Sequence, residues 1–77
     1  MRDIVERVLD LAAKQFGVER SSLSPTDDIF QALGIDSFQA VELTSEVEMA
    51  FDVEIPDYEL QPVRTFADLA AVIDKRR

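Results

Sequence analysis

The sequence predicts an all-α protein, a small bundle of three to four helices with a long first loop. Apolar residues recur at helical spacing in three segments, and the stretches between and beside them contain both glycines and all three prolines. Alternation with a period of two is confined to residues 51–55, which are too isolated to build a sheet. The chain has 77 residues, 47% of them hydrophobic and 31% charged, so we expect one folded domain over residues 1–77.

The first helix is predicted over about residues 3–16, because apolar and charged side chains fall on opposite sides. Asp3 with Glu6 three residues later resembles a capping box at its start. Gly17 stands where a C-terminal cap is expected. The apolar side consists of Ile4, Val5, Val8, Leu9, Ala12 and Phe16.

Residues 18–35 lack a clear period and predict a long loop, with a short helical turn near residues 29–33. Loops of this length are uncommon in compact domains and are more often functional than accidental. Four apolar side chains are expected to attach this loop to the core: Leu23, Ile29, Phe30 and Leu33.

Asp36 predicts the N-cap of a second main helix that runs to about Phe51 and is broken by residues 52–56. At about 100° per residue, the face expected in the core contains Ala40, Leu43, Val47, Ala50 and Phe51. The opposite face carries an apolar strip rimmed by carboxylates, made of Phe38, Val41, Ser45 and Met49 with Glu42 and Glu48. This strip favours a protein-docking surface, and the alternative is that Phe38 folds under the preceding loop.

The C-terminal part predicts one helical turn over residues 57–60, stopped by Pro62, and a last helix that begins near Thr65. The last helix is expected to point Phe66, Leu69, Ala70 and Ile73 inward, while Lys75, Arg76 and Arg77 complement its C-terminal dipole. The predicted core and potential cavity lining consist of Ala40, Leu43, Val47, Phe51, Ile55, Phe66, Leu69 and Ile73.

The charge distribution restricts the partners. The net charge is -8, and no Lys or Arg occurs from Ser21 to Val63. Such an acidic block repels nucleic acid and anionic membranes and attracts basic protein surfaces, although acidic residues can also merely keep a small protein soluble. The N-terminus is charged and no long apolar run occurs, so we expect a cytoplasmic monomer without membrane insertion.

Most enzyme chemistries are excluded by composition. The sequence contains no cysteine and no histidine, so it has no disulfide, no thiolate or imidazole metal site, and no Cys/His or Ser/His catalytic pair. Calcium binding is disfavoured because no Asp-x-Asp-x-Asp-Gly loop with a later Glu occurs. Asp27 and Asp28 are adjacent acids without a partner acid or ligand set, so we do not expect an enzyme.

Ser37 is the candidate for covalent chemistry. A serine hydroxyl is a poor nucleophile without a base, and Asp36 is already needed as the helix cap, so self-catalysis is not expected. A serine in the first turn of a helix suits a phosphate ester, because free N–H groups and the helix dipole stabilise an anion. The alternative is that Ser37 is a routine first-turn residue.

The segments Gly34-Ile35-Asp36-Ser37-Phe38, Val41-Glu42-Leu43 and Phe51-Asp52-Val53-Glu54-Ile55-Pro56-Asp57 closely resemble those of acyl carrier proteins. The resemblance implies that a phosphopantetheinyl transferase attaches 4'-phosphopantetheine from coenzyme A to Ser37, giving an arm that carries cargo as a thioester. It also implies that the second main helix docks onto basic patches of acyl-loading and acyl-processing enzymes, with roles for Glu42, Glu46 and Glu48.

Three residues depart from the pattern of carriers in fatty acid synthesis. Phe38 stands where leucine usually follows the modified serine, and Ser45 and Met49 replace positions that are commonly methionine and acidic. A dedicated carrier for polyketide, lipid-modifying or aminoacyl and peptidyl pathways therefore stands beside the fatty acid pathway. The alternative from another class is a non-carrier acidic helical interaction domain that uses Phe38, Val41 and Met49 as its apolar anchor.

Overall fold

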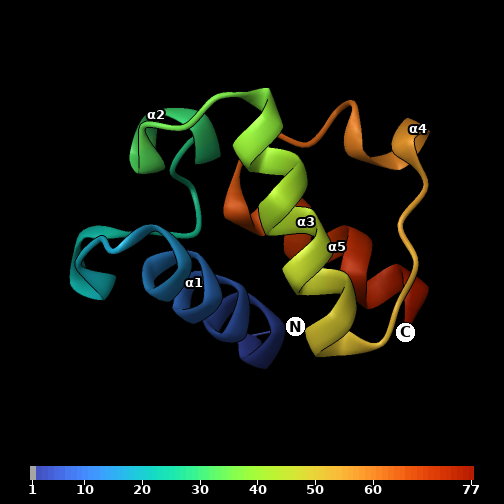
Figure 1. Ribbon diagram of the computed structural model, residues 1–77. Coiled ribbons are helices and arrows are strands. Elements are labelled where there is room, and N and C mark those ends of the chain that lie inside the picture. Colours follow the sequence, from blue (N-terminus) through green and yellow to red (C-terminus); the bar gives the residue numbers. More distant parts are fainter. Residues whose placement is uncertain (1) are drawn as a thin grey trace.

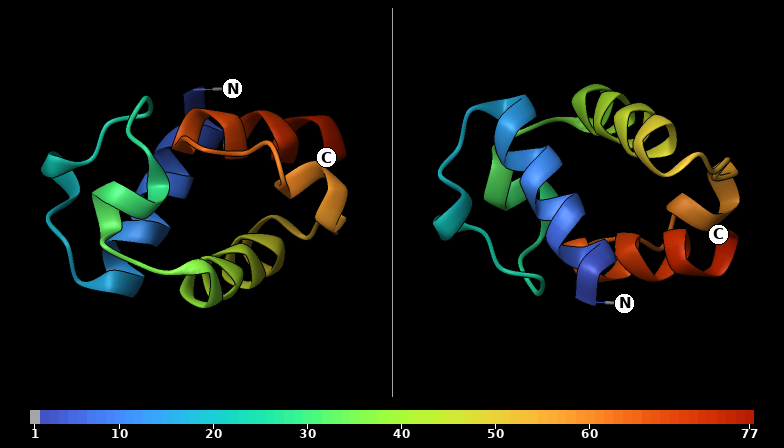
Figure 2. Two further views of the ribbon diagram at one scale, coloured as in Figure 1. Left: turned by 90° about the horizontal axis from the view of Figure 1, so that it is seen from above. Right: turned by 90° about the horizontal axis from the view of Figure 1, so that it is seen from below.

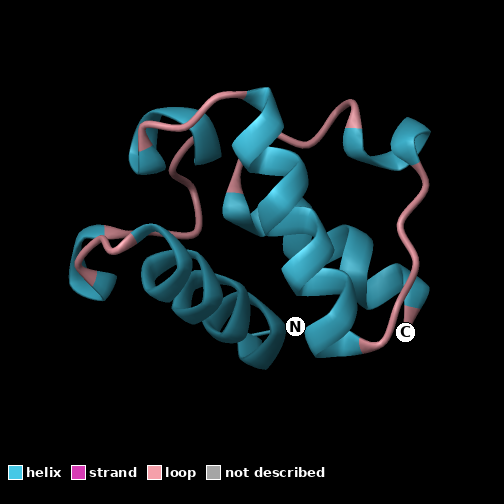
Figure 3. Ribbon diagram, in the orientation of Figure 1, coloured by secondary structure: helices cyan, strands magenta, loops and turns pink. Residues whose placement is uncertain are grey.

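The computed structural model describes residues 2–77, which form five α-helices and one 3-10 turn (Figure 1). In chain order these are α1 (Arg2–Phe16), η1 (Arg20–Ser22), α2 (Ile29–Leu33), α3 (Ser37–Phe51), α4 (Asp57–Leu60) and α5 (Phe66–Arg76). Figure 3 shows only helices and loops in this part of the chain, where a single isolated bridge pairs Asp28 with Thr65. The predicted all-α bundle is confirmed, with three long helices and two short ones.

The beginning of α1 differs from the prediction. The helix already includes Arg2, so Asp3 lies inside its first turn, and the predicted capping box of Asp3 with Glu6 is wrong. A carboxylate in the first turn still favours the helix, because it faces the positive end of the dipole. At the other end Gly17 adopts a φ of 65°, which confirms it as the C-terminal cap.

The core is formed mainly by the three long helices, and α1 packs against both α3 and α5. From α1, Val8 and Leu9 are at most 1% exposed, and Phe66 at the start of α5 is 0% exposed. The inward residues predicted for α5 are confirmed as buried: Phe66, Leu69, Ala70 and Ile73. Thr65 caps α5 in a capping box with Asp68, whose carboxylate accepts hydrogen bonds from the Arg64 and Thr65 N–H groups at 3.0 and 3.1 Å.

The core face of α3 is only partly as predicted. Leu43 and Val47 are buried, whereas Ala40 and Phe51 are half-buried and Ala50 is exposed. The prediction for Ala50 is wrong because α1 meets this end of α3 with a polar side chain. The Arg7 guanidinium donates to the Ala50 carbonyl at 3.1 Å and lies 4.2 Å above the centre of the Phe51 ring.

The predicted long loop contains η1 and α2, and the helical turn at residues 29–33 is confirmed. Its apolar anchors Leu23, Ile29 and Leu33 are buried, but Phe30 is 38% exposed, so its assignment to the core is wrong. Two backbone hydrogen bonds connect this loop to the start of α5: the Ile29 N–H donates to the Arg64 carbonyl at 2.8 Å, and the Ala67 N–H donates to the Pro25 carbonyl at 2.9 Å. The loop is therefore tied to the body of the protein.

The short helix α4 lies at one end of the molecule, between α3 and α5, in both views of Figure 2. Residues 57–60 are helical as predicted, but none of them is buried. The basic residues at the end of α5 do more than complement its dipole, because Lys75 and Arg76 reach across to α4 and pair with Glu59.

Candidate functional site

Ser37 is the first residue of α3, and its side chain is exposed. Asp36 precedes it as the N-cap, which confirms the predicted cap. The Asp36 carboxylate accepts the Gln39 N–H at 2.9 Å, and the Gln39 side chain accepts the Asp36 N–H at 3.2 Å. This reciprocal capping box fixes the first turn of α3. Sequence reasoning missed the part of Gln39, although Asp-x-x-Gln is a recognisable signal.

The turn before Ser37 is held by α2. Gly34 ends α2 in the left-handed conformation with a φ of 64°, which favours glycine. The Ile35 N–H donates to the Phe30 carbonyl at 3.2 Å, and the Ile35 side chain is only 9% exposed. Ser37 therefore lies two residues after Ile35, which is buried and hydrogen-bonded, so the backbone at Ser37 is held in one position.

The outer face of α3 carries the predicted strip of apolar residues. Phe38, Val41 and Met49 are 73%, 63% and 73% exposed, so Phe38 does not fold under the preceding loop. Glu42, Ser45 and Glu46 are also exposed beside them. No Lys or Arg occurs within α3. We call this surface the α3 strip, made of Phe38, Val41, Glu42, Ser45, Glu46 and Met49.

Glu48 lies beside Ser45 and Met49 of the α3 strip, but it differs from them in its contacts. Its side chain is half-buried, and its carboxylate accepts the Ile55 N–H at 2.8 Å. Glu48 thus holds the loop that follows α3. This loop begins at Asp52, a non-glycine residue in the left-handed conformation with a φ of 55°.

A cavity of about 360 Å³ lies beside α3. Of the residues predicted as core or cavity lining, Ala40, Leu43 and Leu69 line it. Sequence reasoning missed the contributions of α2, α4 and the loop after α4, because helices of five and four residues are too short to show a period that reveals their inner side. Its full lining comprises Ile29, Phe30, Ala40, Val41, Leu43, Thr44, Asp57, Leu60, Gln61, Val63, Arg64 and Leu69.

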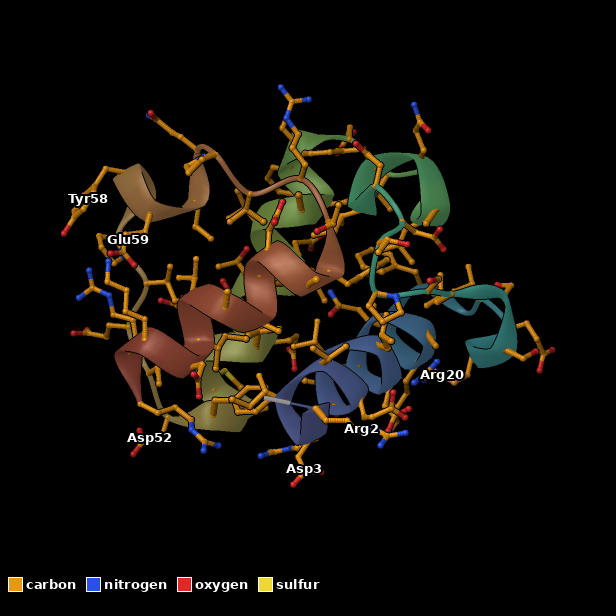
Figure 4. The ribbon with its side chains drawn as sticks, turned by 180° about the vertical axis from the view of Figure 1, so that it is seen from behind. Arg2, Asp3, Arg20, Asp52, Tyr58 and Glu59 are labelled. Atoms are coloured by element: carbon orange, nitrogen blue, oxygen red, sulfur yellow. The ribbon has the colours of Figure 1, made fainter. Side chains whose placement is uncertain are left out.

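A cluster of charged side chains joins α4 to the end of α5, where Figure 4 labels Tyr58 and Glu59. The Glu59 Oε1 atom lies 3.1 Å from Lys75 Nζ and 2.9 Å from Arg76 Nη2, and Glu59 Oε2 accepts from Arg76 Nε at 3.1 Å. The hydrogen bonds from Arg76 and Lys75 lower the pKa of Glu59 from 4.5 to about 2. We call Tyr58, Glu59, Lys75 and Arg76 the Glu59 clamp.

Other charges serve the scaffold. Arg20 pairs with Glu6 and Asp10 at 3.2 and 2.8 Å and so holds η1 against α1. The pKa of Asp68 is lowered by the hydrogen bonds it accepts from the backbone N–H groups of Arg64 and Thr65. Within residues 2–77, no group of three acidic, cysteine or histidine side chains is arranged to hold a metal ion, and no helix is long and apolar enough to cross a membrane.

The surroundings of Ser37 fit a phosphate ester that carries a long arm. In the described part of the chain, the Ser37 hydroxyl has no hydrogen-bond partner, and it stands in the open rather than in the core. Asp36 uses one first-turn N–H group of α3, that of Gln39, and the positive end of the helix dipole favours an anion at this position. A flexible arm attached here would begin one turn before Ala40 and Val41, which line the cavity.

Comparisons with known proteins agree with this geometry. Residues 6–73 match the family model described as the phosphopantetheine attachment site. The chain is 37% identical over 71 residues to an acyl carrier protein of Syntrophobacter fumaroxidans, covering 92% of this chain and 88% of that protein. It is 36% identical over 72 residues to an acyl carrier protein of Akkermansia muciniphila, covering 94% and 90%. This chain therefore belongs to the acyl carrier protein family, whose fold provides a phosphopantetheine attachment site.

Proposed function

We propose that Ser37 carries the 4'-phosphopantetheine arm and that the protein delivers acyl intermediates, held on this arm as thioesters, to a series of enzymes. The observation that carries the proposal is the exposed, unpartnered Ser37 hydroxyl at the start of α3, one turn from an apolar cavity. When bound, the arm supplies the thiol that the sequence itself lacks. The protein acts as a carrier that other enzymes modify and load.

Each neighbouring residue has a distinct part in this proposal. Asp36 and Gln39 fix the first turn of α3, so the attachment point is presented to the transferase in one orientation. The cavity shelters apolar cargo, because Leu43, Leu60 and Leu69 among its lining residues offer an apolar surface that excludes water.

The α3 strip is the proposed docking surface for the transferase and for the acyl-loading and acyl-processing enzymes. Its carboxylates Glu42 and Glu46 attract basic patches and raise association rates, and Phe38, Val41 and Met49 supply apolar contact area once the partner has arrived. Because Glu48 is bound to the Ile55 N–H, we leave it out of the docking set.

The cargo class follows from the cavity. Its lining includes six aliphatic side chains from α2, α3, α4, α5 and the loop after α4: Ile29, Val41, Leu43, Leu60, Val63 and Leu69. An apolar lining favours acyl chains of fatty acid, polyketide or specialised lipid biosynthesis over aminoacyl or peptidyl cargo, whose polar groups lose hydration on entry.

Attachment is tested by intact mass before and after incubation with coenzyme A and a broad-specificity phosphopantetheinyl transferase. The wild-type protein is expected to gain one phosphopantetheine, and Ser37→Ala is expected to gain none. Ser21→Ala serves as the matched control, because it removes an exposed serine hydroxyl that lies outside α3 and the α3 strip. A gain that persists in Ser37→Ala would place the arm elsewhere.

The second candidate function is a non-carrier interaction domain, which the exposure of Phe38 and Met49 supports. It predicts no mass gain with several transferases and partner binding that survives Ser37→Ala but is lost in Phe38→Ala. The carrier proposal predicts the mass gain first, so one experiment separates the two functions.

A further inference from the structure

The walls of the cavity are packed to different degrees. α2, α3 and α5 each contribute a buried side chain to the lining, namely Ile29, Leu43 and Leu69. By contrast, α4 has only four residues, none of them buried, and its N-cap Pro56 makes no side-chain capping hydrogen bond. Among the walls of the cavity, α4, which contributes Leu60, can therefore move with the smallest loss of packing contacts.

Ionic contacts hold this wall in place. The Glu59 carboxylate forms ion pairs with Lys75 and with Arg76, which it meets through two guanidinium nitrogens, Nε and Nη2. The Tyr58 hydroxyl accepts a further hydrogen bond from Arg76 at 3.2 Å. The Glu59 side chain is only 9% exposed, while that of Lys75 is 73% exposed. Fork-like Arg–carboxylate pairs are among the stronger charged contacts. Leu60, the next residue after Glu59, lines the cavity.

The size of the cavity makes the position of α4 important. About 360 Å³ is near the lower end of the ~300–1,000 Å³ typical of ligand pockets. Of the other walls, Ile29, Leu43 and Leu69 belong to the close-packed interior and do not yield readily. The exposed residues Phe30 and Val41 lie on the side that faces solvent. An acyl chain longer than this space is therefore fully enclosed only if α4 moves away from α5, and that movement breaks the contacts of Glu59.

We propose that the Glu59 clamp sets the length of acyl chain that the cavity accepts. Short chains are fully enclosed while the clamp is closed, and longer chains stay partly outside until Glu59 separates from Lys75 and Arg76. The inference rests on the carrier function proposed above. Glu59 is a positioning residue in this account, because it acts through α4 and does not touch the cargo.

The test compares chain-length profiles of thioester protection. The arm is loaded with a series of straight acyl chains, from butyryl to palmitoyl, and the rate of thioester cleavage by hydroxylamine is measured for each. In the wild-type protein, protection is expected to increase with chain length and then to stop increasing. In Glu59→Gln, which keeps the side-chain shape but removes the charge, protection of the longer chains is expected to improve several-fold.

Control variants separate the clamp from general effects. Glu54→Gln removes the same charge from an exposed residue of the neighbouring loop that has no ion pair in the described structure. Arg7→Gln loosens the contact between α1 and α3 without touching α4. Both are expected to keep the wild-type profile. Arg76→Lys retains the charge but loses the fork, so its limit should lie between those of wild type and Glu59→Gln, and it replaces Glu59→Gln should that variant not fold.

Coincident profiles for wild type and Glu59→Gln would overturn the proposal, as would wild-type protection that keeps increasing to the longest chain. Absence of an attached arm would instead contradict the carrier function, and the clamp is then tested on the unmodified protein by amide hydrogen exchange. Glu59→Gln is expected to accelerate exchange in residues 57–63 only. An unchanged rate there, or acceleration throughout the protein, would also overturn the proposal.

Discussion

The contact of α5 with α1 and the contact of α5 with α4 are built from different interactions. The core that α1 and α5 share contains Val8, Phe66 and Ile73, each 0% exposed. The α4 contact relies on the charges of Glu59 and Arg76 beside a cavity. Apolar packing is insensitive to salt and moderate acid, whereas ion pairs respond to both. The core between α1 and α5 is therefore the stable part of this chain, and the contact between α4 and α5 is the part that can open.

The largest expected effect tests whether the core between α1 and α5 provides most of the free energy of unfolding. Phe66→Ala should lower the free energy of unfolding by about 3–5 kcal/mol, because it leaves a hole in a closed core. Phe30→Ala, on the 38% exposed ring that lines the cavity, should lower it by about 1 kcal/mol or less. Urea unfolding midpoints measure both. Equal losses of free energy in the two variants would mean that the side chains around the cavity are packed as tightly as the core between α1 and α5.

The next effect concerns the start of α5. Thr65→Ala removes the hydroxyl that accepts the Asp68 N–H at 3.0 Å, so the free energy of unfolding should fall by about 1 kcal/mol. Thr26→Ala, on an exposed threonine outside the helices, is the matched control and should change little. Thermal unfolding of the two variants would contradict this account if their midpoints were the same.

A smaller change of opposite sign is expected at the end of α3. Asp52 holds a φ of 55°, a conformation that costs other residues more than glycine. Asp52→Gly should therefore raise the free energy of unfolding by about 0.5 kcal/mol, after the greater freedom of glycine in the unfolded chain is subtracted. Glu46→Gly, inside the same helix, should lower it by about 1 kcal/mol. Destabilisation by both variants would argue against strain at Asp52.

The last prediction concerns acid and the Glu59 clamp. Hydrogen bonds from Arg76 and Lys75 lower the pKa of Glu59 from 4.5 to about 2, so the clamp stabilises the fold above pH 4.5 and this contribution is lost as the pH falls toward 2. The difference in melting temperature between wild type and Glu59→Gln should shrink over this window. The comparison cancels most effects of the other carboxylates. A difference that stays constant from pH 5 to 2 would contradict the lowered pKa.

Much of the fold could be predicted because its helices carry strong local signals. The spacing of apolar residues predicted α3 from Ser37 to Phe51 with Asp36 as its cap, and Pro62 correctly marked the end of α4. The errors arose where another helix decides the environment. Ala50 has the spacing of a core residue, but Arg7 of α1 meets that end of α3 with a charge.

The candidate site was predictable to a similar extent. Ser37 and the exposure of Phe38 and Met49 follow from the short motif and the helical period. The Glu59 clamp was not predicted, because its partners lie 16 and 17 positions along the chain in a helix that the sequence alone does not orient. The hydrogen bond from the Ile55 N–H to Glu48 was not predicted for a related reason, since the loop after α3 folds back onto this helix.

The backbone hydrogen bonds between the long loop and α5 bear on mechanical load. A force applied at Ser37 passes through Asp36 to Ile35, whose N–H is bonded to α2, and from Ile29 to the Arg64 carbonyl. These bonds lie in series between Ser37 and the body, so a partner that pulls away displaces the whole domain before it stretches the loop. Ser37 is therefore connected rigidly to the rest of the domain. Under tension, the group attached to Ser37 stretches before the protein does.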